Sequence, residues 1–409
     1  MSDMHLVQKL PPMLTGNELT QALAVLPEYD PDILNQNDAR RLMALTDLYR
    51  VYVPNQMTKE IYSKLYLALL RSLQKKEGSL RVKQSLENYK AIQRQQFSGI
   101  LGGADSFTII GGSGIGKSSA ISRALALLTP EQIIETGPLF TRILPCVLVQ
   151  CPFDASVKGL LLEILRVVDR QLGSCYHAKA ATVRATTDML IGTVSQVCLN
   201  HIGILVVDEI QNVAAAKNGR NLLGALLQLI NCSGISICMV GTPECNDFFT
   251  QAMQLARRSL GLQYTAMEYG GEFVTLCQIL FRYQYTRHPV KPDTAIIRWL
   301  YEHSGGNVSS VVTLLHDAQE ISILDGSEVL TVEALEAAYE RRMKMLHSYI
   351  SPTKRPQTSH MRHCENVVLK DSSGMGTISI QKLVQEAKNK GIGVAPYLAT
   401  FITLEEVQL

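Results

Sequence analysis

The sequence predicts an α/β fold built on a parallel sheet and followed by a small helical region. Three short, continuous apolar runs, residues 107–110, 202–207 and 235–240, have the form of buried strands. Apolar residues at helical spacing follow the first run, between residues 119 and 128. Because strands that alternate with helices are typical of a parallel sheet, we expect this architecture within residues 101–270.

A glycine-rich loop of the form G-x-x-x-x-G-K-S joins the first strand to the first helix. With the residue that opens the helix, it comprises Gly111, Gly112, Ser113, Gly114, Ile115, Gly116, Lys117, Ser118 and Ser119. In such a P-loop, backbone N–H groups and the positive helix end cradle phosphates, Lys117 reaches the β- and γ-phosphates, and Ser118 offers a hydroxyl to Mg²⁺. A chance match is the alternative for the pattern alone. We expect the loop to bind ATP or GTP.

Two carboxylates end the second apolar strand, as in a Walker B segment. We expect Asp208 to hold Mg²⁺ through its water shell, because Mg²⁺ prefers few carboxylates and keeps several waters. Glu209 is placed to polarise the water that attacks the γ-phosphate. The alternative is a buried strand with a solvated acidic end. Beside the P-loop, the segment predicts hydrolysis of ATP with Mg²⁺.

The third apolar strand runs into a Gly-Thr-Pro sequence at residues 241–243. Ligands of α/β sheets gather at the carboxyl ends of strands, so Thr242 is expected beside the same phosphate site. Its hydroxyl is a candidate for placing the lytic water. A plain turn made by Gly241 and Pro243 is the alternative.

Composition favours an intracellular globular protein. The 409 residues are 46% hydrophobic, which is enough for two or three domains with full cores. The nine cysteines are scattered without a C-x-x-C pair, so neither a zinc site nor a disulfide framework is predicted, and we expect reduced core residues. No signal sequence is evident, and no apolar run approaches the ~20 residues of a membrane span. A cytoplasmic location is expected.

The net charge of +2 does not by itself announce a nucleic-acid partner. Basic residues nevertheless concentrate in two segments, residues 71–94 and 341–363. Each segment can equally be a solvated helix face. The charge pattern therefore permits an anionic partner without requiring one.

Four regions can be distinguished along the chain. Residues 1–100 are a proline-containing arm and helical region, 101–270 the nucleotide-binding core, 271–350 a helical lid, and 351–409 a flexible linker and tail. Helices are expected at 39–50, 59–73, 293–303, 308–324 and from a cap at Thr331 to about residue 349. The apolar end of the tail either docks into a partner or packs back on the chain.

A P-loop α/β domain followed by a helical lid is the plan of an AAA+ ATPase. Such proteins form rings or filaments, because an arginine from the next subunit completes the site and stabilises the transition state. Arg257 and Arg258 are the candidates for this finger, and a solvated basic pair is the alternative. The usual lid arginine is missing, because residues 308–310 are Val-Ser-Ser. We therefore expect slow turnover, with the nucleotide acting as a switch.

The motifs resemble those of TnsC, the AAA+ regulator of cut-and-paste and CRISPR-associated transposons. The resemblance is carried by the P-loop, by Leu-Val-Val-Asp-Glu-Ile-Gln at residues 205–211, and by Met-Val-Gly-Thr-Pro at 239–243. Two less generic segments add to it, residues 169–176 and 256–258. It spans about residues 51–349, whereas the first fifty residues and the tail are only loosely similar.

The resemblance implies polymerisation on double-stranded DNA with ATP bound. It further implies a target-selection partner of the TnsD or TniQ type and a transposase of the TnsA/TnsB type that is engaged by the tail. The residues that match DNA-contacting positions of the family are Lys158, Lys179, Thr182 and Arg184. Such contacts would go to phosphates and position the protein without reading sequence. A solvated surface residue is the alternative for each.

Two other functions are compatible with the same motifs. A replication initiator or helicase loader is the first, although no winged-helix pattern follows the lid. A signalling NTPase scaffold that does not bind DNA is the second, although few residues remain after the lid for a sensor domain. DNA binding at varied salt discriminates the classes.

Overall fold

The structure, a computed structural model, describes residues 6–76, 106–131, 133–135, 142–182, 185–216, 219–246 and 260–343. The chain divides into two compact units, Met1–Pro352 and Thr353–Leu409, and all described residues lie in the first. Arg184, Arg257, Arg258 and the predicted tail therefore lie outside the described residues. Within the described ranges, no helix is both long and apolar enough to cross a bilayer.

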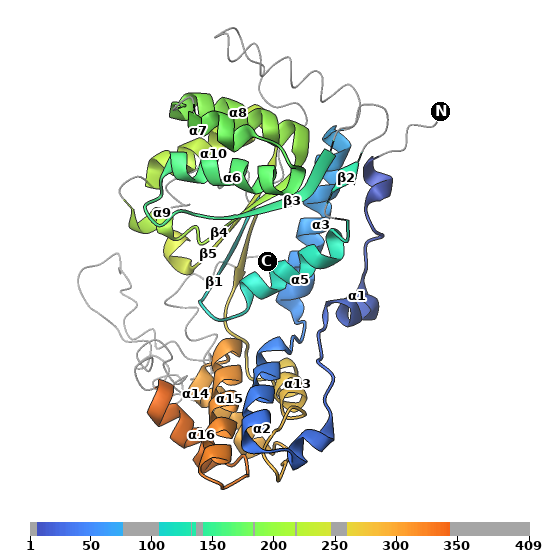
Figure 1. The fold of residues 1–409 in the computed structure, drawn as a ribbon, viewed down its shortest axis with the longest axis vertical. Coiled ribbons are helices and arrows are strands. Elements are labelled where there is room, and N and C mark those ends of the chain that lie inside the picture. The colour runs from blue at the N-terminus through green and yellow to red at the C-terminus, as the bar shows by residue number, and fades with distance from the viewer. Residues whose placement is uncertain are drawn as a thin grey trace, which may run out of the picture. The chain divides into compact units, whose positions relative to one another are not determined.

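One sheet forms the centre of the nucleotide-binding part, with strands in the order β2-β3-β4-β5-β1-β6 (Figure 1). The strands are β1 (Phe107–Gly111), β2 (Ile134–Glu135), β3 (Arg142–Gln150), β4 (Ile202–Asp208), β5 (Ser236–Gly241) and β6 (Leu260–Tyr264). Every neighbouring pair is parallel except β2 with β3. Strands β1 and β5 are buried along their whole length, as expected for parallel strands covered on both faces. The predicted parallel α/β sheet is confirmed.

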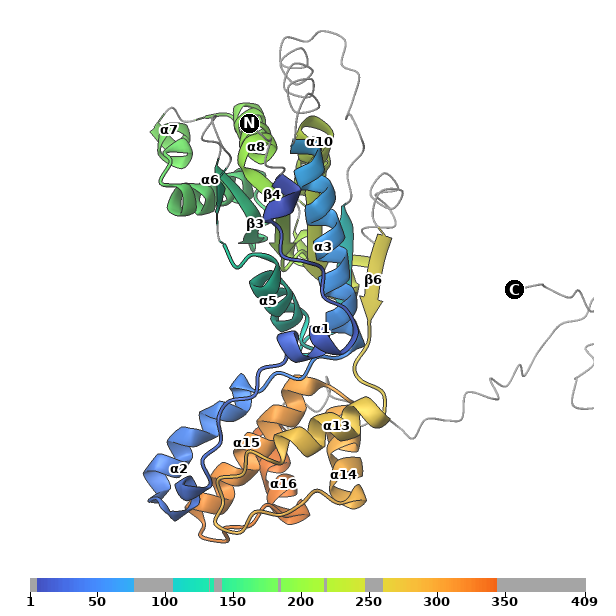
Figure 2. The ribbon, with the colours of Figure 1, turned by 90° about the vertical axis from the view of Figure 1, so that its right-hand side faces the viewer.

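Helices cover both faces of this sheet (Figures 1 and 2). The side chains of α6, α8 and α10 form one apolar core with alternate residues of the strands, and those of α3 and α5 form a second core with the other residues. These helices are α3 (Gln56–Lys76), α5 (Lys117–Leu128), α6 (Val157–Leu172), α8 (Thr187–His201) and α10 (Gly219–Ser233). The two cores follow from the two-residue side-chain period of a strand.

Shorter elements connect the larger ones. They are α7 (Tyr176–Thr182), α9 (Asn212–Ala215) and η4 (Pro243–Cys245). Helix α7 is held at its start by Asp169, whose carboxylate accepts hydrogen bonds from the backbone N–H groups of Tyr176 at 2.9 Å and His177 at 2.8 Å. Asp169, which is part of the segment 169–176, thus stabilises the start of α7.

The lid is helical, as predicted. It contains α13 (Gly271–Leu280), α14 (Thr294–Ser304), α15 (Val308–Leu324), α16 (Val332–Ala338) and a π-helical turn, η5 (Tyr339–Met343). The side chains of Asp293, Asn307 and Thr331 cap α14, α15 and α16 by accepting backbone N–H bonds. The helix expected from Thr331 to about residue 349 is α-helical only to Ala338, and residues beyond Met343 lie outside the described ranges.

The amino-terminal region packs on both the sheet and the lid. Its elements are η1 (Leu6–Lys9), α1 (Gly16–Leu23), η2 (Pro31–Asn35), α2 (Asp38–Ala44) and η3 (Leu45–Arg50). Residues of η1 and α1 join the core shared by α3 and the sheet, whereas Leu45 and Leu48 join the core of the lid. The helix expected at 39–50 is split, because residues 45–50 are wound as a 3-10 helix.

The chain passes from the sheet to the lid and back through two short segments that pair with each other. Val25 and Tyr52 form an antiparallel bridge, with N–H···O distances of 2.9 and 2.8 Å. Residues 24–28 and 51–55 therefore form a two-stranded strap between the sheet and the lid. Both segments of the strap belong to the region 1–100, which was predicted to be separate from the nucleotide-binding core.

None of the eight cysteines within the described ranges forms a disulfide. Five of them are buried, as expected, but Cys175 is exposed at the turn before α7. Burial raises the pKa of the Cys151, Cys198 and Cys277 thiols to about 12. These thiols therefore stay protonated and behave as small apolar side chains.

A buried ion pair fastens the amino-terminal region to the lid. The guanidinium of Arg41, which is 0% exposed, donates to both carboxylate oxygens of Glu328 at 2.5 Å. It also donates to the carbonyl of Tyr285 at 3.0 Å and to Asp38 at 2.7 Å. The hydrogen bonds from Arg41 lower the pKa of Glu328. Such a paired charge is tolerated in the interior only while its partners remain.

Replacing Arg41 is expected to destabilise the protein strongly. Arg41→Ala should lower the free energy of unfolding by about 3 kcal/mol, because Glu328, which is 13% exposed, loses its bidentate partner and its carboxylate keeps, within the described residues, only the contacts with Arg287. The matched control is Arg40→Ala on the exposed side of the same helix, which should change stability by less than about 0.5 kcal/mol. Equal urea midpoints for the two variants would contradict this assignment.

The same pair should make stability depend on pH. Because the folded pKa of Glu328 is depressed, its contribution is present above the unfolded value of about 4.3 and is lost as the pH falls through the folded value. The destabilisation caused by Arg41→Ala should therefore shrink below pH 4, which urea unfolding at pH 7 and pH 3 would measure.

Candidate nucleotide-binding site

The P-loop connects β1 to α5 in a geometry that requires glycine. Gly114 and Gly116 have positive φ angles of 78° and 97°, which side chains rarely adopt. A Cβ on Gly111 would lie 2.8 Å from the carbonyl oxygen of Tyr264 in β6. Helix α5 then begins at Lys117, so its first N–H groups face the loop. The predicted strand, loop and helix arrangement is present.

Lys117 is held inside the loop. Its Nζ donates to the carbonyl oxygens of Gly111 at 2.7 Å and Gly112 at 2.8 Å. Partial burial lowers the pKa of this ammonium group, while the carboxylates of Asp208 and Glu209 oppose that shift. The ammonium therefore lies among the loop atoms that would surround a bound phosphate.

The side chains of Ser118 and Asp208 meet as the Mg²⁺ prediction requires. The Ser118 hydroxyl donates to Oδ2 of Asp208 at 3.0 Å, which joins the start of α5 to the end of β4. Both are hard oxygen donors of the kind that Mg²⁺ prefers. The donor set fits Mg²⁺, with space in the adjoining cavity for water ligands.

Glu209 adopts an uncommon backbone conformation directly after β4. Its φ angle is 58°, in the left-handed region that costs energy for a residue with a side chain. Its N–H donates to Oδ1 of Asp208 at 2.8 Å, and its carboxylate accepts a hydrogen bond from the amide of Gln211. The sequence analysis did not single out Gln211 as a site residue, although it stands two residues after Glu209.

The carboxyl ends of β1, β4 and β5 converge on one cavity of about 270 Å³. Thr242 lies at this edge after β5, as predicted, and its hydroxyl donates to Glu244 at 2.7 Å. The lining residues are Ser113, Gly114, Gly116, Lys117, Ser118, Ser119, Asp208, Glu209, Gln211, Gly241, Thr242 and Ser309. The structure thus brings the predicted P-loop, Walker B and Thr242 residues together.

A second cavity, of about 550 Å³, shares Gly114, Gly116, Ser118, Ser119 and Ser309 with the first. Its other lining residues come from η3, the strap, α5 and the lid: Leu48, Tyr49, Arg50, Val51, Tyr52, Ser122, Arg123, Val308 and Val312. The guanidinium of Arg123 lies 5.8 Å from the ring centre of Tyr52. Aromatic and aliphatic walls beside a phosphate site suit a nucleoside.

This second cavity was not predicted from the sequence. Its residues belong to three segments that are far apart in the chain, and no local motif marks them. The one local signal was the aromatic pair Tyr49 and Tyr52, which lies at the end of the helix expected at 39–50 and just after it. Their shared location becomes evident only from the packing of η3 on the lid.

Residues of the lid contact the P-loop directly. The amide of Asn307 donates to the carbonyl oxygen of Ser113 at 2.7 Å, and the N–H of Ser309 donates to that of Gly114 at 3.1 Å. Val308 and Ser309 occupy the cavity side of the α15 start, where the sequence analysis noted that the usual arginine is missing. The lid therefore meets this site through an amide and a backbone N–H.

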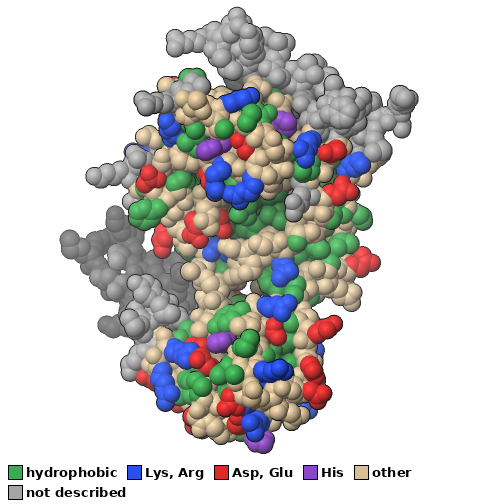
Figure 3. Space-filling view, in the orientation of Figure 1, with side chains coloured by type: hydrophobic (Ala, Val, Ile, Leu, Met, Phe, Trp, Pro, Cys, Tyr) green, Lys and Arg blue, Asp and Glu red, His purple; other side chains and the backbone are tan. Residues whose placement is uncertain are grey.

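Three of the four predicted DNA-contacting residues lie on the neighbouring helices α6 and α7, and the fourth, Arg184, lies outside the described residues. Lys158 is exposed in the first turn of α6, and Lys179 and Thr182 are exposed on α7. The Thr182 hydroxyl donates to the carbonyl of Ala178 at 2.8 Å within its own helix. On the face drawn in Figure 3, basic and acidic side chains are interspersed.

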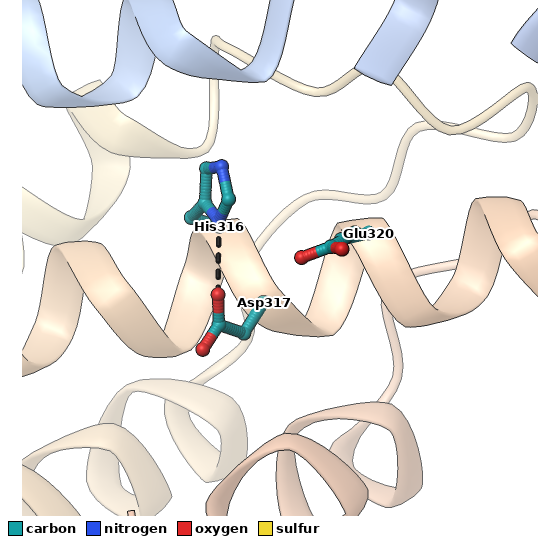
Figure 4. A group of neighbouring side chains, drawn as sticks. All are labelled: His316, Asp317 and Glu320. Atoms are coloured by element: carbon teal, nitrogen blue, oxygen red, sulfur yellow. Dashed lines mark hydrogen bonds and ion pairs between the residues drawn. The ribbon is translucent and has the colours of Figure 1, made fainter. Parts of the chain in front are cut away.

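One further cluster of potential metal ligands lies on α15, where His316, Asp317 and Glu320 face one another (Figure 4). Arg342 already pairs with Asp317 at 3.0 Å and with Glu320 at 2.5 Å. The His316 ring also contacts Tyr49, with ring centres 4.9 Å apart. The acidic charges are thus balanced by an arginine, and the cluster is best described as an ion-pair network.

Comparison with known proteins identifies the nucleotide-binding part. Residues 100–249 match the family described as AAA domain. The chain therefore contains an AAA-type ATPase domain, and the strand order and lid give it the predicted AAA+ fold. Proteins with this domain typically bind nucleotide together with Mg²⁺. None of the curated proteins matches the sequence.

Several solved structures are similar to this chain at low sequence identity. The Aeropyrum pernix ORC1 protein in complex with DNA is 14% identical over 64% of each chain, with a TM-score of 0.40. Drosophila ORC bound to DNA is 12% identical over 99% of this chain and 87% of that one, with a TM-score of 0.45. The ADP form of the Aeropyrum pernix ORC2 protein is 14% identical over 79% of each chain, with a TM-score of 0.40. At these identities the likeness concerns the fold alone.

Replacing Lys117 should abolish nucleotide binding. Lys117→Ala removes the ammonium group that is held in the P-loop, so the affinity for a fluorescent ATP analogue should fall about 100-fold, as expected for a charged hydrogen-bond contact of about 3 kcal/mol. Lys291→Ala, an exposed lysine of the lid, is the matched control and should bind like the wild type. Unchanged affinity of Lys117→Ala would contradict the assigned site.

Proposed function

We propose that this protein is an ATP-dependent AAA+ regulator of DNA transposition that assembles on duplex target DNA and links a target-selection protein to a transposase. One observation carries the nucleotide part: Lys117, the Ser118–Asp208 pair and Glu209 line a single cavity. The transposition part is supported by the resemblance of the motifs to TnsC.

The cavity suits hydrolysis of ATP to ADP and phosphate. Lys117 is placed to neutralise the β- and γ-phosphates, and the Glu209 carboxylate to accept a proton from the attacking water. Mg²⁺ held at Ser118 and Asp208 would neutralise charge on the phosphates. The Glu209 carboxylate is bonded to the Gln211 amide, so it has to exchange this partner for the water.

Assembly into a ring or helical filament supplies the remaining charge. In this proposal Arg257 or Arg258 of one copy reaches the phosphates bound to the next copy, where an arginine finger accelerates hydrolysis. The lid meets the cavity without an arginine at residues 308–310, which supports slow turnover used as a switch.

DNA would lie along the surface that carries Lys158, Lys179 and Thr182, and Arg184, which lies outside the described residues, is proposed as a fourth contact. The first three are exposed on α6 and α7, which pack against each other. Phosphate contacts from such residues position a protein without selecting sequence. The amino-terminal region would meet a TnsD- or TniQ-type target selector, and the tail after residue 351 a transposase of the TnsA/TnsB type.

A replication initiator or helicase loader, and a signalling scaffold that does not bind DNA, are the competing functions. Electron microscopy of the protein with duplex DNA, comparing a slowly hydrolysed ATP analogue with ADP, tests the proposal. Rings or filaments on DNA with the analogue only are expected. A protein that stays off DNA in both states would favour the scaffold.

Replacing Glu209 should separate binding from hydrolysis. Glu209→Gln retains the shape of the side chain but loses the base, so the turnover number should fall by about 10²–10⁴-fold, while affinity for ATP stays within twofold. Longer-lived assemblies on DNA are expected, because ATP persists. Steady-state phosphate release and analogue binding provide the two measurements, and normal turnover would exclude Glu209 as the base.

Removing the exposed lysines should weaken DNA binding in a salt-dependent manner. For the Lys158→Ala, Lys179→Ala double variant, the slope of log K against log salt should decrease by about 2, since each phosphate contact contributes about 0.9. Lys291→Ala on the lid again provides a charge-matched control for each single change. An unchanged slope in fluorescence anisotropy titrations would count against this DNA path.

A further inference from the structure

The side chain of Asn307 connects the lid to the P-loop by a hydrogen bond. The Nδ2 atom of Asn307 donates to the carbonyl oxygen of Ser113 at 2.7 Å, while its Oδ1 atom accepts the N–H of Ser310 at 3.2 Å and thereby caps α15. The N–H of Ser309 adds a bond of 3.1 Å to the carbonyl oxygen of Gly114. Two consecutive carbonyls of the P-loop are thus bound by the first residues of one lid helix.

The position of Asn307 is fixed by the turn that precedes it. Gly305 and Gly306 have positive φ angles of 59° and 75°, and a Cβ on Gly306 would lie 1.9 Å from the carbonyl oxygen of Met267. The N–H of Met267 in turn donates to the carbonyl of Gly306 at 3.0 Å. Only glycine allows this approach, so the turn holds the amide at the P-loop.

On the P-loop side of the contact, the backbone of Gly114 lies close to the side chain of Asn307. A Cβ on Gly114 would lie 2.6 Å from the Oδ1 atom of Asn307. Gly114 and Ser309 line both the cavity of about 270 Å³ and the cavity of about 550 Å³. A change in the P-loop that turns the Ser113 or Gly114 carbonyl therefore alters the lid contact and both cavities together.

We propose that Asn307 is a positioning residue that couples the lid to the nucleotide-bound P-loop, in place of a charged lid side chain. This inference rests on the proposed nucleotide site. The P-loop N–H groups would hold the phosphates of a bound nucleotide, while the carbonyls of Ser113 and Gly114 are directed at Asn307 and Ser309. Since coupling between two sites is reciprocal, a docked lid strengthens nucleotide binding and bound nucleotide strengthens lid docking to the same extent.

Two variants at residue 307 separate this role from helix capping. Serine and aspartate cap helices about as well as asparagine, but neither provides the amide donor. Asn307→Ser should weaken binding of a fluorescent ATP analogue about 3- to 10-fold, as expected for the loss of one hydrogen bond. Asn307→Asp should weaken it further, because its carboxylate faces the Ser113 carbonyl and the phosphates.

Hydrogen exchange supplies a readout that a purely structural role would not change. In the wild type, nucleotide should slow amide exchange in residues 308–312, and in Asn307→Ser this protection should be largely lost. Asp293→Ser makes the corresponding cap substitution at the start of α14 and should retain both affinity and protection. Thermal unfolding of all three variants verifies that the lid is folded.

The results of these measurements test the coupling role of Asn307 separately from the proposed nucleotide-binding function. Wild-type affinity and wild-type protection in both variants at residue 307 would overturn the coupling role while the nucleotide site stands. Equal loss in Asp293→Ser would also overturn it, since the effect would then reflect lid stability. If the wild-type protein binds no ATP analogue, both the proposed function and this inference are wrong.

Discussion

The convergence of three parallel strands at one edge of the sheet is the constraint on which the rest of the structure depends. Strands β1, β4 and β5 end beside one another, so the P-loop, the Asp208–Glu209 pair and Thr242 share a cavity although they are far apart in the chain. Parallel pairing itself requires helices as crossovers, and these helices bury both faces of the sheet. The parallel pairing of the strands therefore determines both where the nucleotide site lies and how the core is buried.

The lid and the strap form those walls of the nucleotide site that the sheet does not supply. The second cavity lies where the end of η3, the strap residues Val51 and Tyr52, α5 and the start of α15 meet. Arg41 fastens the amino-terminal region to the lid, and the Val25–Tyr52 bridge fastens the two crossings of the chain to each other. The walls of the nucleotide site are therefore positioned by contacts remote from any phosphate.

Much of the sheet and the phosphate site could be predicted from sequence, because both are encoded locally. A buried parallel strand is a continuous apolar run, and a P-loop needs glycines at fixed offsets from its lysine, as Gly114 and Gly116 demonstrate. The strap, the second cavity and the Asn307 contact could not be predicted, because each depends on contacts between separate segments of the chain that no local motif links. The 3-10 winding of residues 45–50 was missed because packing of Leu45 and Leu48 on the lid outweighs helix propensity.

The amino-terminal region packs on both the sheet and the lid. This packing limits which fragments of the protein can fold on their own. A fragment limited to residues 100–249, the segment that matches the AAA domain, would strip α3 from the sheet and uncover the apolar residues beneath it. A fragment beginning at residue 51 would in turn uncover the lid surface that Leu45 and Leu48 bury. The smallest piece able to fold independently thus has to include residues 6–76, so a boundary drawn from motif similarity alone cuts through two hydrophobic cores.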